Sequence, residues 1–529
     1  MKQKIFALFL ILCGLCLNLK AETQGDIVGR VLDDSGAPLA GATVQMVNAK
    51  GGVTTDEDGY FRIPYSKDGT VRVKVSFVGY QTQTFVLKAD ERKGEQHVLR
   101  LQPDATALDQ VVITATRTPK ALKDAPVVTR LITANDIKIV DATNIQDLLT
   151  EQMPGLEFGY AMNQETSLNM NGFGGNAVLF LVDGERLAGE TMDNVDYSRL
   201  NLDNVGRIEI VKGAASALYG ANAVAGVINI ISRENSEPWT ANVNTRYNDF
   251  NKEWRHGGSF SFNAGKWNSQ TSIQRTTSDE VQLTSPFDTE SNILHIYGGE
   301  TFNVKERLTY KLSDKVKLIG RGGYFARISN RSNYDDHYKD YSAGLKTVMN
   351  LSENDNLEIS YGFDQYDKTR FVNNERTHYH DYTNRQNTVR ALYSHIFGKN
   401  TLTAGADFLN DYLTTYQFAN NGSKTQNSYD AFAQFDYNPL QWLNIVASLR
   451  HDYFSASSQH ATTGRLALMI KWKGFSIRAN YAGGFRAPTL KEMYMNFDMA
   501  GMQMIYGNPD LKPEKSDNIQ PWRWSIPEG

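Results

Sequence analysis

The chain has 529 residues and a formal net charge of −4, and 41% of its residues are hydrophobic and 11% aromatic. This length and hydrophobic content exceed what one ordinary core needs and predict several domains. The near-neutral charge excludes the basic footprint of a nucleic-acid-binding protein. After Leu19 the sequence has no run of 18 apolar residues, so it predicts no membrane-spanning helix.

Residues 1–21 have the pattern of a secretory signal peptide. Two lysines precede an apolar run from Ile5 to Leu17, and Ala21 offers a small residue for cleavage. Both cysteines of the chain, Cys13 and Cys16, lie inside this segment. The mature chain is therefore expected to use no disulfide, no thiolate metal site and no cysteine nucleophile. For an exported chain of this kind, soluble periplasmic domains and a β-barrel are the two alternatives.

Residues 22–103 are predicted to form a small antiparallel β-sandwich. Short β-branched runs (IVGRVL, ATVQMV, VRVKVSFV and TQTFVL) alternate with the turn signals DDSGAP, DEDG and KDG. The combination of GRVLDDSGAPLAGATVQ, TTDEDGYFRI and VSFVGYQ resembles the carboxypeptidase-regulatory-like domain. That module also accompanies metallocarboxypeptidases, but the chain contains neither HExxH nor HxxE, which favours a spacer domain over a peptidase.

A linker is predicted at residues 104–120, and it contains the stretch DQVVITATRTPK, Asp109 to Lys120. Its β-branched residues suit a strand, yet no hairpin partner with a two-residue turn flanks them. Two interpretations are open. The strand pairs with something outside its own neighbourhood, or it is the last strand of the preceding sandwich.

Residues 121–235 have the pattern of a mixed α/β domain. We expect a helix at 144–152, buried strands at 177–182 and 208–212, and a Gly-rich connection between Gly213 and Gly226. Enzyme templates do not fit. GFGGNA is one residue short of a dinucleotide fingerprint and precedes a strand, and the sequence has neither a P-loop nor a G-x-S-x-G elbow.

Three motifs in this domain carry a family resemblance. They are Pro154-Gly155-Leu156, the stretch from Leu181 to Arg186, and the long element from Ile208 through Ile231. In this order and at about these distances they resemble the plug domain of TonB-dependent outer-membrane transporters. The alternative, that these are packing glycines of another α/β domain, requires a chance match over the whole of the last element.

Residues 236–529 alternate in polarity with a period of two. Residues 357–364 and 475–482 are examples, and one face would meet lipid while the other lines a polar lumen. Links at 313–315 and 438–441 are predicted as short periplasmic turns, and 329–341 and 371–385 as outward loops. The predicted fold is mainly β: a small sandwich, then an α/β plug, then a transmembrane antiparallel β-barrel. A soluble sandwich or propeller would lack the asymmetry of the links and the plug.

The barrel is expected to be partial. The resemblance implies roughly 22 strands, as in large outer-membrane transporters. The residues after the plug supply only about 14 at roughly 20 residues per strand and link. Near the end, Pro521, Trp522, Trp524 and Pro527 are expected to interrupt the last strand. Together these features suggest a shortened form of a longer receptor.

The resemblance gives the linker strand a role, because this family carries its TonB box there. The residues that fit the box are Asp109, Val111, Val112, Ile113, Thr114 and Ala115. An extended segment of this kind would pair with TonB, in the TonB–ExbB–ExbD complex, by β-augmentation. The implied function is active import across the outer membrane of a Gram-negative bacterium, in contact with lipid and without enzymatic activity. A surface capture protein that imports nothing is the alternative, and a surface lipoprotein partner is left open.

The expected cargo is a scarce iron-containing ligand, namely haem. Lys212 to Ser216 reads KGAAS where glycan importers carry a K-D-A-S motif, which disfavours an oligosaccharide. FRAP at Phe485–Pro488 and NPDL at Asn508–Leu511 resemble two boxes of haem-uptake receptors. Cobalamin and siderophore receptors carry relatives of these boxes, so both cargoes are alternatives. No resident cofactor is expected.

The axial histidines of haem receptors have no counterpart here, because no histidine occurs at 104–255 or 485–511. Thioether and phenolate groups also ligate haem iron, while clustered methionines more often supply adaptable apolar surface. Two histidines at i and i+2 of an extended loop point the same way and are a further option. The candidate ligand-binding residues are Tyr160, Met162, His378, His380, Met493, Tyr494, Met502 and Tyr506. No metal-ligand set is assigned.

Overall fold

The computed structural model describes residues 25–33, 36, 38–39, 41–47, 52–56, 58–65, 69–77, 82–89, 97–101, 111–160, 164–190, 194–235, 237–284, 293–377, 381–472, 475–499 and 501–525. The chain divides into two compact units, one within residues 1–110 and one within residues 111–528. The expected signal peptide lies outside the described residues. No helix in the described part is both long and apolar enough to cross a membrane.

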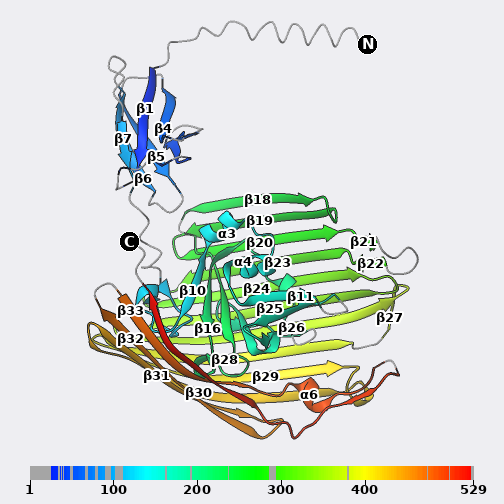
Figure 1. The fold of residues 1–529 in the computed structure, drawn as a ribbon. Coiled ribbons are helices and arrows are strands. Elements are labelled where there is room, and N and C mark those ends of the chain that lie inside the picture. Colours follow the sequence, from blue (N-terminus) through cyan, green and yellow to red (C-terminus); the bar gives the residue numbers. More distant parts are fainter. Residues whose placement is uncertain are drawn as a thin grey trace, which may run out of the picture. The chain divides into compact units, whose positions relative to one another are not determined.

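The first unit is a β-sandwich of two small sheets with strand orders β4-β1-β7 and β3-β2-β5-β6 (Figure 1). Its strands are β1 (Gly25–Leu32), β2 (Thr43–Met46), β3 (Gly52–Thr54), β4 (Tyr60–Tyr65), β5 (Gly69–Ser76), β6 (Gln83–Ala89) and β7 (His97–Arg100). Alternate residues of β5, namely Val71, Val73 and Val75, are buried in the core, as the strand period requires. The sandwich prediction is confirmed, and the strands predicted from the four β-branched runs are β1, β2, β5 and β6. The prediction that it is antiparallel throughout is wrong, because β1 and β7 pair in parallel.

The second unit begins with the plug, which contains a five-stranded mixed sheet of order β10-β16-β17-β14-β15 and a small sheet of order β11-β12-β13. Its elements are β8 (Val111–Val112), β9 (Lys120–Ala121), η1 (Leu122–Asp124), β10 (Thr129–Thr133), α3 (Ala134–Val140), α4 (Ile145–Gln152), β11 (Leu156–Tyr160), β12 (Thr166–Met170), β13 (Phe173–Gly174), η2 (Gly175–Ala177), β14 (Val178–Val182), β15 (Glu185–Arg186), η3 (Tyr197–Arg199), β16 (Val205–Lys212), α5 (Ser216–Tyr219) and β17 (Gly226–Ser232).

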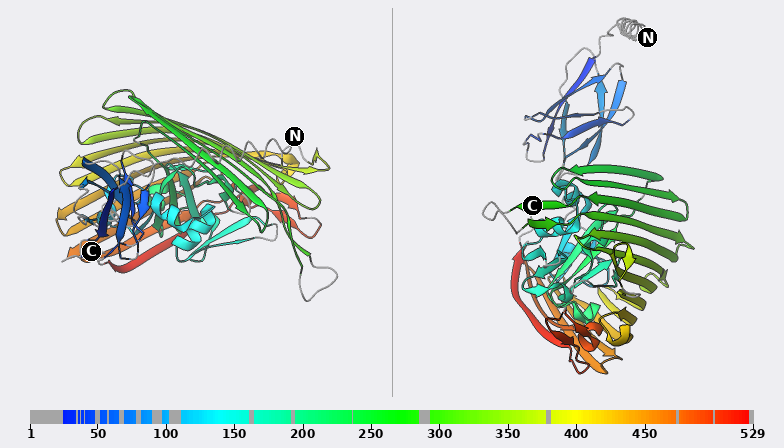
Figure 2. Two further views of the ribbon diagram at one scale, coloured as in Figure 1. Left: turned by 90° about the horizontal axis from the view of Figure 1, so that it is seen from above. Right: turned by 90° about the vertical axis from the view of Figure 1, so that its right-hand side faces the viewer.

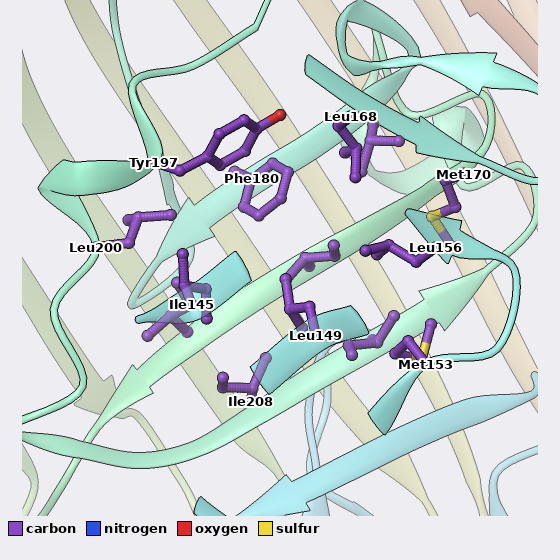
Figure 3. Close-up of a cluster of buried hydrophobic side chains, with 14 of the residues drawn as sticks. Ile145, Leu149, Met153, Leu156, Leu168, Met170, Phe180, Tyr197, Leu200 and Ile208 are labelled. Carbon is purple, nitrogen blue, oxygen red and sulfur yellow. The ribbon is translucent and has the colours of Figure 1, made fainter. Parts of the chain in front are cut away.

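The plug core lies between α4 and the five-stranded sheet (Figure 3). Asn144 caps α4 by accepting a hydrogen bond from the N–H of Asp147, and Ile145 and Leu149 are buried against Phe180. The predicted helix at 144–152 and the predicted strands at 177–182 and 208–212 are confirmed as α4, β14 and β16. The sequence reading did not single out α3, although it begins with a capping box.

The rest of the unit is an antiparallel sheet of 15 strands that curves around the plug (Figure 2). The short β27 pairs off the main path, which leaves 14 strands along it, as the residue count predicts. The strands of the path are β18 (Trp239–Asn248), β19 (Glu253–Ala264), β20 (Trp267–Ser278), β23 (Gly299–Lys311), β24 (Val316–Asn330), β25 (Asp335–Asn350), β26 (Asp355–Val372), β28 (Tyr382–Phe397), β29 (Asn400–Thr415), β30 (Ser423–Leu440), β31 (Leu443–Phe454), β32 (Gln459–Trp472), β33 (Phe475–Arg486) and β36 (Glu514–Ser525).

The links between these strands differ at the two ends of the sheet. One end has short turns, such as 312–315, 398–399 and 441–442. The other end, called here the loop end, has longer connections that contain β21 (Val281–Thr284) and β22 (Ile293–Ile296), β27 (Glu375–Arg376), η4 (Ala419–Asn421), and α6 (Leu490–Tyr494) with β34 (Asn496–Asp498) and β35 (Met504–Tyr506). The predicted asymmetry of the links is confirmed.

The two faces of the sheet differ in polarity, as predicted. On β26, Ile359 and Tyr361 are 45% and 44% exposed on the outer face, whereas Ser360 and Asp364 are buried toward the plug. Apolar side chains therefore point outward and polar ones inward.

The predicted outward loop at 329–341 is wrong for most of its length. β24 continues to Asn330 and β25 begins at Asp335, so the link is only four residues long. The polar residues that suggested a loop face the plug instead, since Tyr338 and Asp340 are buried there.

The predicted interruption of the last strand at Pro521, Trp522 and Trp524 is also wrong, and Pro527 lies outside the described residues. β36 runs through Pro521, and its pairing with β33 shifts register between Arg478 and Asn480. A bulge of this kind is where a strand accommodates proline. In the described residues, β18 and β36 each pair with a single neighbour in this sheet.

Candidate functional site

The predicted TonB box is docked inside the second unit. β8 pairs antiparallel with β9, with Val111 opposite Ala121 and Val112 opposite Lys120. Among the described residues, the sheets of the sandwich contain β1 to β7 and not β8. The interpretation of the box as the last sandwich strand is therefore wrong. As the sequence indicated, no two-residue turn joins the strand to a partner, and β9 follows only after a link of seven residues. Asp109 lies outside the described residues.

The carboxylate of Glu209, on β16, holds the backbone of the box. It accepts hydrogen bonds from the main-chain N–H groups of Ile113 at 2.8 Å and Thr114 at 2.7 Å. Glu209 is fully buried, and Arg207 donates to its other oxygen at 2.7 Å. Hydrogen bonds to an ionised acceptor are about twice as strong as neutral ones. Glu209 thus occupies main-chain donors of the kind that β-augmentation uses. Sequence reasoning missed this role, because Glu209 and the box are far apart in the chain.

Plug and barrel side chains hold the rest of the box. Tyr219 donates its hydroxyl to the carbonyl of Thr114 at 3.0 Å, and Asn229 donates to the hydroxyl of Thr114 at 3.0 Å. Gln434, on β30, donates to the carbonyl of Thr116 at 2.7 Å. Every one of these bonds must break before the box can leave as an extended strand.

An apolar cluster underlies the docked box, and we call it the apolar contact. Val112 and Ala115 are fully buried in it. It joins box and plug residues to barrel residues, namely Val112, Ala115, Leu218, Tyr219, Leu392, Phe432, Val446 and Ala467. The box therefore sits at a joint between the plug and the barrel wall.

A second joint between plug and wall consists of buried ion pairs, and we call it the charged contact. Arg199, at the end of η3, lies 2.7 Å from a carboxylate oxygen of Asp340 and 2.9 Å from one of Asp364. Burial disfavours the charged guanidinium, but the two aspartates outweigh it and raise the pKa of Arg199 above its usual value.

The charged contact extends toward the loop end through Arg327 of β24. Arg327 lies 3.1 Å from Glu165 and 3.1 Å from Asp196, both on the plug. The hydroxyl of Tyr338 donates to Glu165 at 2.7 Å. β24, β25 and β26 are thus tied to the plug by largely buried charged groups.

The FRAP residues Phe485 and Arg486 are engaged in contacts within the protein. Phe485 is fully buried, its N–H donates to the hydroxyl of Ser216, and its carbonyl accepts from the N–H of Asn222 at 3.1 Å. Arg486 pairs with Glu492 at 2.9 Å and with Glu514. Phe485 thus attaches β33 to the plug, Arg486 is paired with acidic side chains of α6 and β36, and none of these contacts involves a ligand.

The candidate ligand-binding residues fall into four groups. Met162, His378 and His380 lie outside the described residues. Met493 is 1% exposed in a cluster with Tyr382 and Phe418, so its thioether is enclosed by apolar side chains.

Tyr160, Met502 and Tyr506 are the exposed members, at 79%, 72% and 70%. Met502 and Tyr506 belong to the β34–β35 hairpin region at the loop end of the barrel. Tyr160 ends β11, and Gln164 beyond it bonds to the β22 region at the same end. Tyr494 is partly covered, with the ammonium of Lys424 4.6 Å from its ring centre. The structure thus places three of the candidates, exposed, at the loop end of the unit.

Within the described part of the chain, no group of three or more His, Cys, Asp or Glu residues has the geometry to hold a metal ion.

Comparison with known families places this architecture. The TonB-dependent Receptor Plug Domain model matches residues 121–227, and the TonB dependent receptor-like beta-barrel model matches residues 290–520. A CarboxypepD_reg-like domain matches residues 27–113. The two receptor models together cover more than half of the chain. The chain belongs to the TonB-dependent receptors. Members of this family are outer-membrane transporters and receptors rather than enzymes, and the plug is the domain through which they engage TonB.

Curated relatives are transporters and an iron-regulated protein. The Vitamin B12 transporter BtuB of Photobacterium profundum is 25% identical over 436 residues, which cover 79% of this chain and 67% of the relative. The Iron-regulated outer membrane virulence protein of Vibrio cholerae is 25% identical over 446 residues, which cover 78% of this chain and 66% of the relative. The chain therefore spans about two thirds of the length of these relatives.

Solved structures share the fold. The siderophore receptor PirA from Acinetobacter baumannii has a TM-score of 0.63 at 17% identity, covering 74% of this chain and 67% of that one. A mutant of the ferric enterobactin receptor PfeA from Pseudomonas aeruginosa also has a TM-score of 0.63 at 17% identity, covering 77% and 69%. At this identity the likeness concerns the fold alone.

Proposed function

We propose that this receptor imports haem actively across the outer membrane. The observation that carries the cargo assignment is the set of exposed apolar side chains on the β34–β35 region at the loop end, including Met502 and Tyr506, together with the exposed Tyr160 at the end of β11. Large exposed apolar side chains clustered on one surface mark a binding site. A flat porphyrin ring would bury them, and methionine adapts to such a surface. Burial of the ring, more than a metal bond, would supply most of the affinity.

Energy for import would come through the docked box. TonB, driven by ExbB and ExbD, would pair with the strand at Val111 to Ala115 by β-augmentation. Because Glu209, Tyr219 and Asn229 hold this strand to the plug, a pull on the strand would act directly on β16 and β17. Outer-membrane lipid would surround the apolar outer face, and a surface lipoprotein remains a further partner to test.

Specific observations also favour two other cargoes. The relatives named above include a vitamin B12 transporter and siderophore receptors, so cobalamin and a ferric siderophore are the competing ligands. A hydrophilic ferric siderophore would favour cationic side chains, whereas the exposed β34–β35 region presents methionine and tyrosine. A capture protein without import would have no use for a docked TonB box.

The test is haem titration of the complete receptor. The variant carries alanine at Met499, Met502 and Met504, which are 40%, 72% and 47% exposed. Its matched control is Met493→Leu, a methionine of the same segment that is buried and offers nothing to a ligand. We expect the Soret shift to persist in the control. In the triple variant the affinity should fall about tenfold or more, because burying exposed methionines is worth over a kilocalorie.

Two results would reject haem as the cargo. One is an unchanged affinity and Soret shift in the triple variant. The other is cobalamin or a ferric siderophore competing far better than haem itself. Either result leaves the family assignment intact, and energised uptake of the winning competitor then identifies the cargo.

A further inference from the structure

Three cavities lie in series between the plug and the barrel wall, the first facing β20 to β28, the second β23 to β28 and the third β25 to β32. The first, of about 120 Å³, lies at mid-height beside Glu185 and Phe325. The second, of about 610 Å³, shares Asp183, Ser232, Arg307 and Arg321 with the first. The third, of about 1190 Å³, shares Arg117, Val348, Glu358 and Leu392 with the second and is lined by short-turn residues at 352–356 and 441–442. Shared lining residues make the three cavities neighbours along one wall.

The series narrows at its first member. Ligand clefts usually measure about 300–1,000 Å³. The second and third cavities are large enough for a cargo, and the first is too small. At the narrow part, Glu185 of β15 lies 3.5 Å from Arg321 and 3.8 Å from Arg390. A cargo moving down this wall must therefore displace the turn between β14 and β15.

The second cavity, called here the basic chamber, carries an excess of positive charge. Eight of its lining residues are arginine or lysine, and three, Asp183, Glu234 and Glu358, are acidic. Arg307 pairs with Glu234 at 3.0 Å, and Arg207 pairs with Glu209 at 2.7 Å. Arg321 and Arg390 both lie beside Glu185. Lys317 and Lys346 have no hydrogen bond or ion pair to any residue in the described part of the chain. They point from β24 and β25 into the chamber, and Lys346 lies opposite Ser360 in the ladder.

Low-dielectric walls strengthen the field of such charges and concentrate anions between them. We propose that the basic chamber is a transit-binding site for a carboxylate-bearing cargo, on a route that follows β23 to β28 from the plug to the short-turn end. The carboxylates bind Lys317 and Lys346 after the cargo passes Glu185. The choice of cargo rests on the proposed import function, whereas the anion-attracting field of the chamber does not depend on it.

The field is tested by the charge selectivity of thiol labelling. Val348 faces the chamber, lines both lower cavities and pairs with Lys317 in the ladder, and no cysteine of the sequence lies beyond residue 16. The complete receptor carrying Val348→Cys is labelled from the short-turn side with anionic and cationic methanethiosulfonate reagents of similar size. Each rate is divided by that of a free thiol. We expect the anionic reagent to be favoured by roughly tenfold or more.

The same ratio is measured after Lys317→Gln and Lys346→Gln are added together, and it should fall toward one. The matched control is Lys339→Gln, since Lys339 lies on β25 but points away from the chamber. Its ratio should equal that of the Val348→Cys parent. If the parent shows no anionic preference, or if the lysine changes leave the preference intact, the chamber is not an anion site and the proposal is wrong.

The rate of energised uptake provides the second test of the proposal. With both lysines replaced by glutamine, haem affinity in the Soret titration should stay unchanged while the rate of energised uptake falls severalfold. Unchanged uptake with a lost labelling preference would remove the chamber from the route and overturn the proposal. If the wild-type receptor does not bind haem, the cargo assignment fails, and the labelling ratio still decides whether the chamber attracts anions.

Discussion

The plug meets the barrel wall in two chemically opposite ways. At the charged contact, Arg199 and Arg327 bind aspartate and glutamate across the joint at 2.7–3.1 Å. At the apolar contact, Val112 and Leu218 pack with Phe432 and Val446. A buried ion pair requires its partners in one geometry, whereas apolar packing is non-directional and relaxes. The charged contact therefore fixes how the plug is seated, and the apolar contact holds the segment that we propose TonB pulls away.

The largest effect is expected from removing the cation of the charged contact. Arg199→Met leaves Asp340 and Asp364 buried without their counterion, which should lower the free energy of plug opening by about 3–5 kcal/mol. Hydrogen exchange of β16 and β17 in the complete receptor measures this opening. Adding Asp340→Asn and Asp364→Asn should restore much of the loss. A loss as small as that of a surface substitution would show that water reaches the site and that the contact does not seat the plug.

Weakening the apolar contact is expected to lower the free energy of plug opening somewhat less than removing the cation of the charged contact. Leu218 is fully buried, and Leu218→Ala should lower the free energy of opening by about 3 kcal/mol through lost burial and a residual cavity. The effect should appear in the exchange of residues 111–121 as well as in the plug, because Val112 and Ala115 pack in the same cluster. Leu218→Met keeps the volume and should cost less than about 1.5 kcal/mol. Equal losses in the two variants would mean that the cluster does not hold the box.

These two joints also mark what the sequence alone can predict. Polarity with period two indicated the strands of the sheet, and the Asn144 cap with its apolar run indicated α4, because both signals are local. The motif at Ile208 through Ile231 indicated the plug. The contacts were not predictable in this way. Glu209 meets the box, and Arg199 meets Asp340, across about a hundred residues or more of sequence. The same nonlocality made residues 329–341 look like a loop, since their polar groups pair with a plug that the strand pattern does not reveal.

The hold on the box can be weakened without touching either joint. Glu209→Gln removes the charge that accepts the N–H groups of Ile113 and Thr114, and a hydrogen bond to a charged group is worth about 1.5–3 kcal/mol. We expect the free energy needed to release the box from the plug to fall by about 2 kcal/mol. A cysteine at Val111, which is 47% exposed, reports release by its labelling rate relative to the same cysteine in the parent.

Arg207→Gln is the matched control, because it removes the partner of Glu209 and leaves the carboxylate in place. Its labelling rate should rise less than that of Glu209→Gln. If both variants label like the parent, the backbone bonds to Glu209 do not restrain the box.

The smallest effect is expected at an exposed ion pair, and it separates the contribution of burial from that of charge. Lys471 of β32 forms an ion pair with Asp124 of η1, so it also joins wall to plug, but its side chain is 41% exposed and that of Asp124 is 35% exposed. Solvent weakens the attraction and competes for both groups, so Lys471→Gln should change the free energy of plug opening by only about 0–1 kcal/mol. At about 1 M salt the screening length is near 3 Å, so the small contribution of the exposed pair should vanish. The loss caused by Arg199→Met should persist, because the buried pair is screened much less. Exchange of the plug measured at low and high salt in both variants makes the comparison. If Lys471→Gln lowered the free energy of plug opening nearly as much as Arg199→Met, any ion pair across the joint would seat the plug. The charged and apolar contacts would then differ through charge and not through burial.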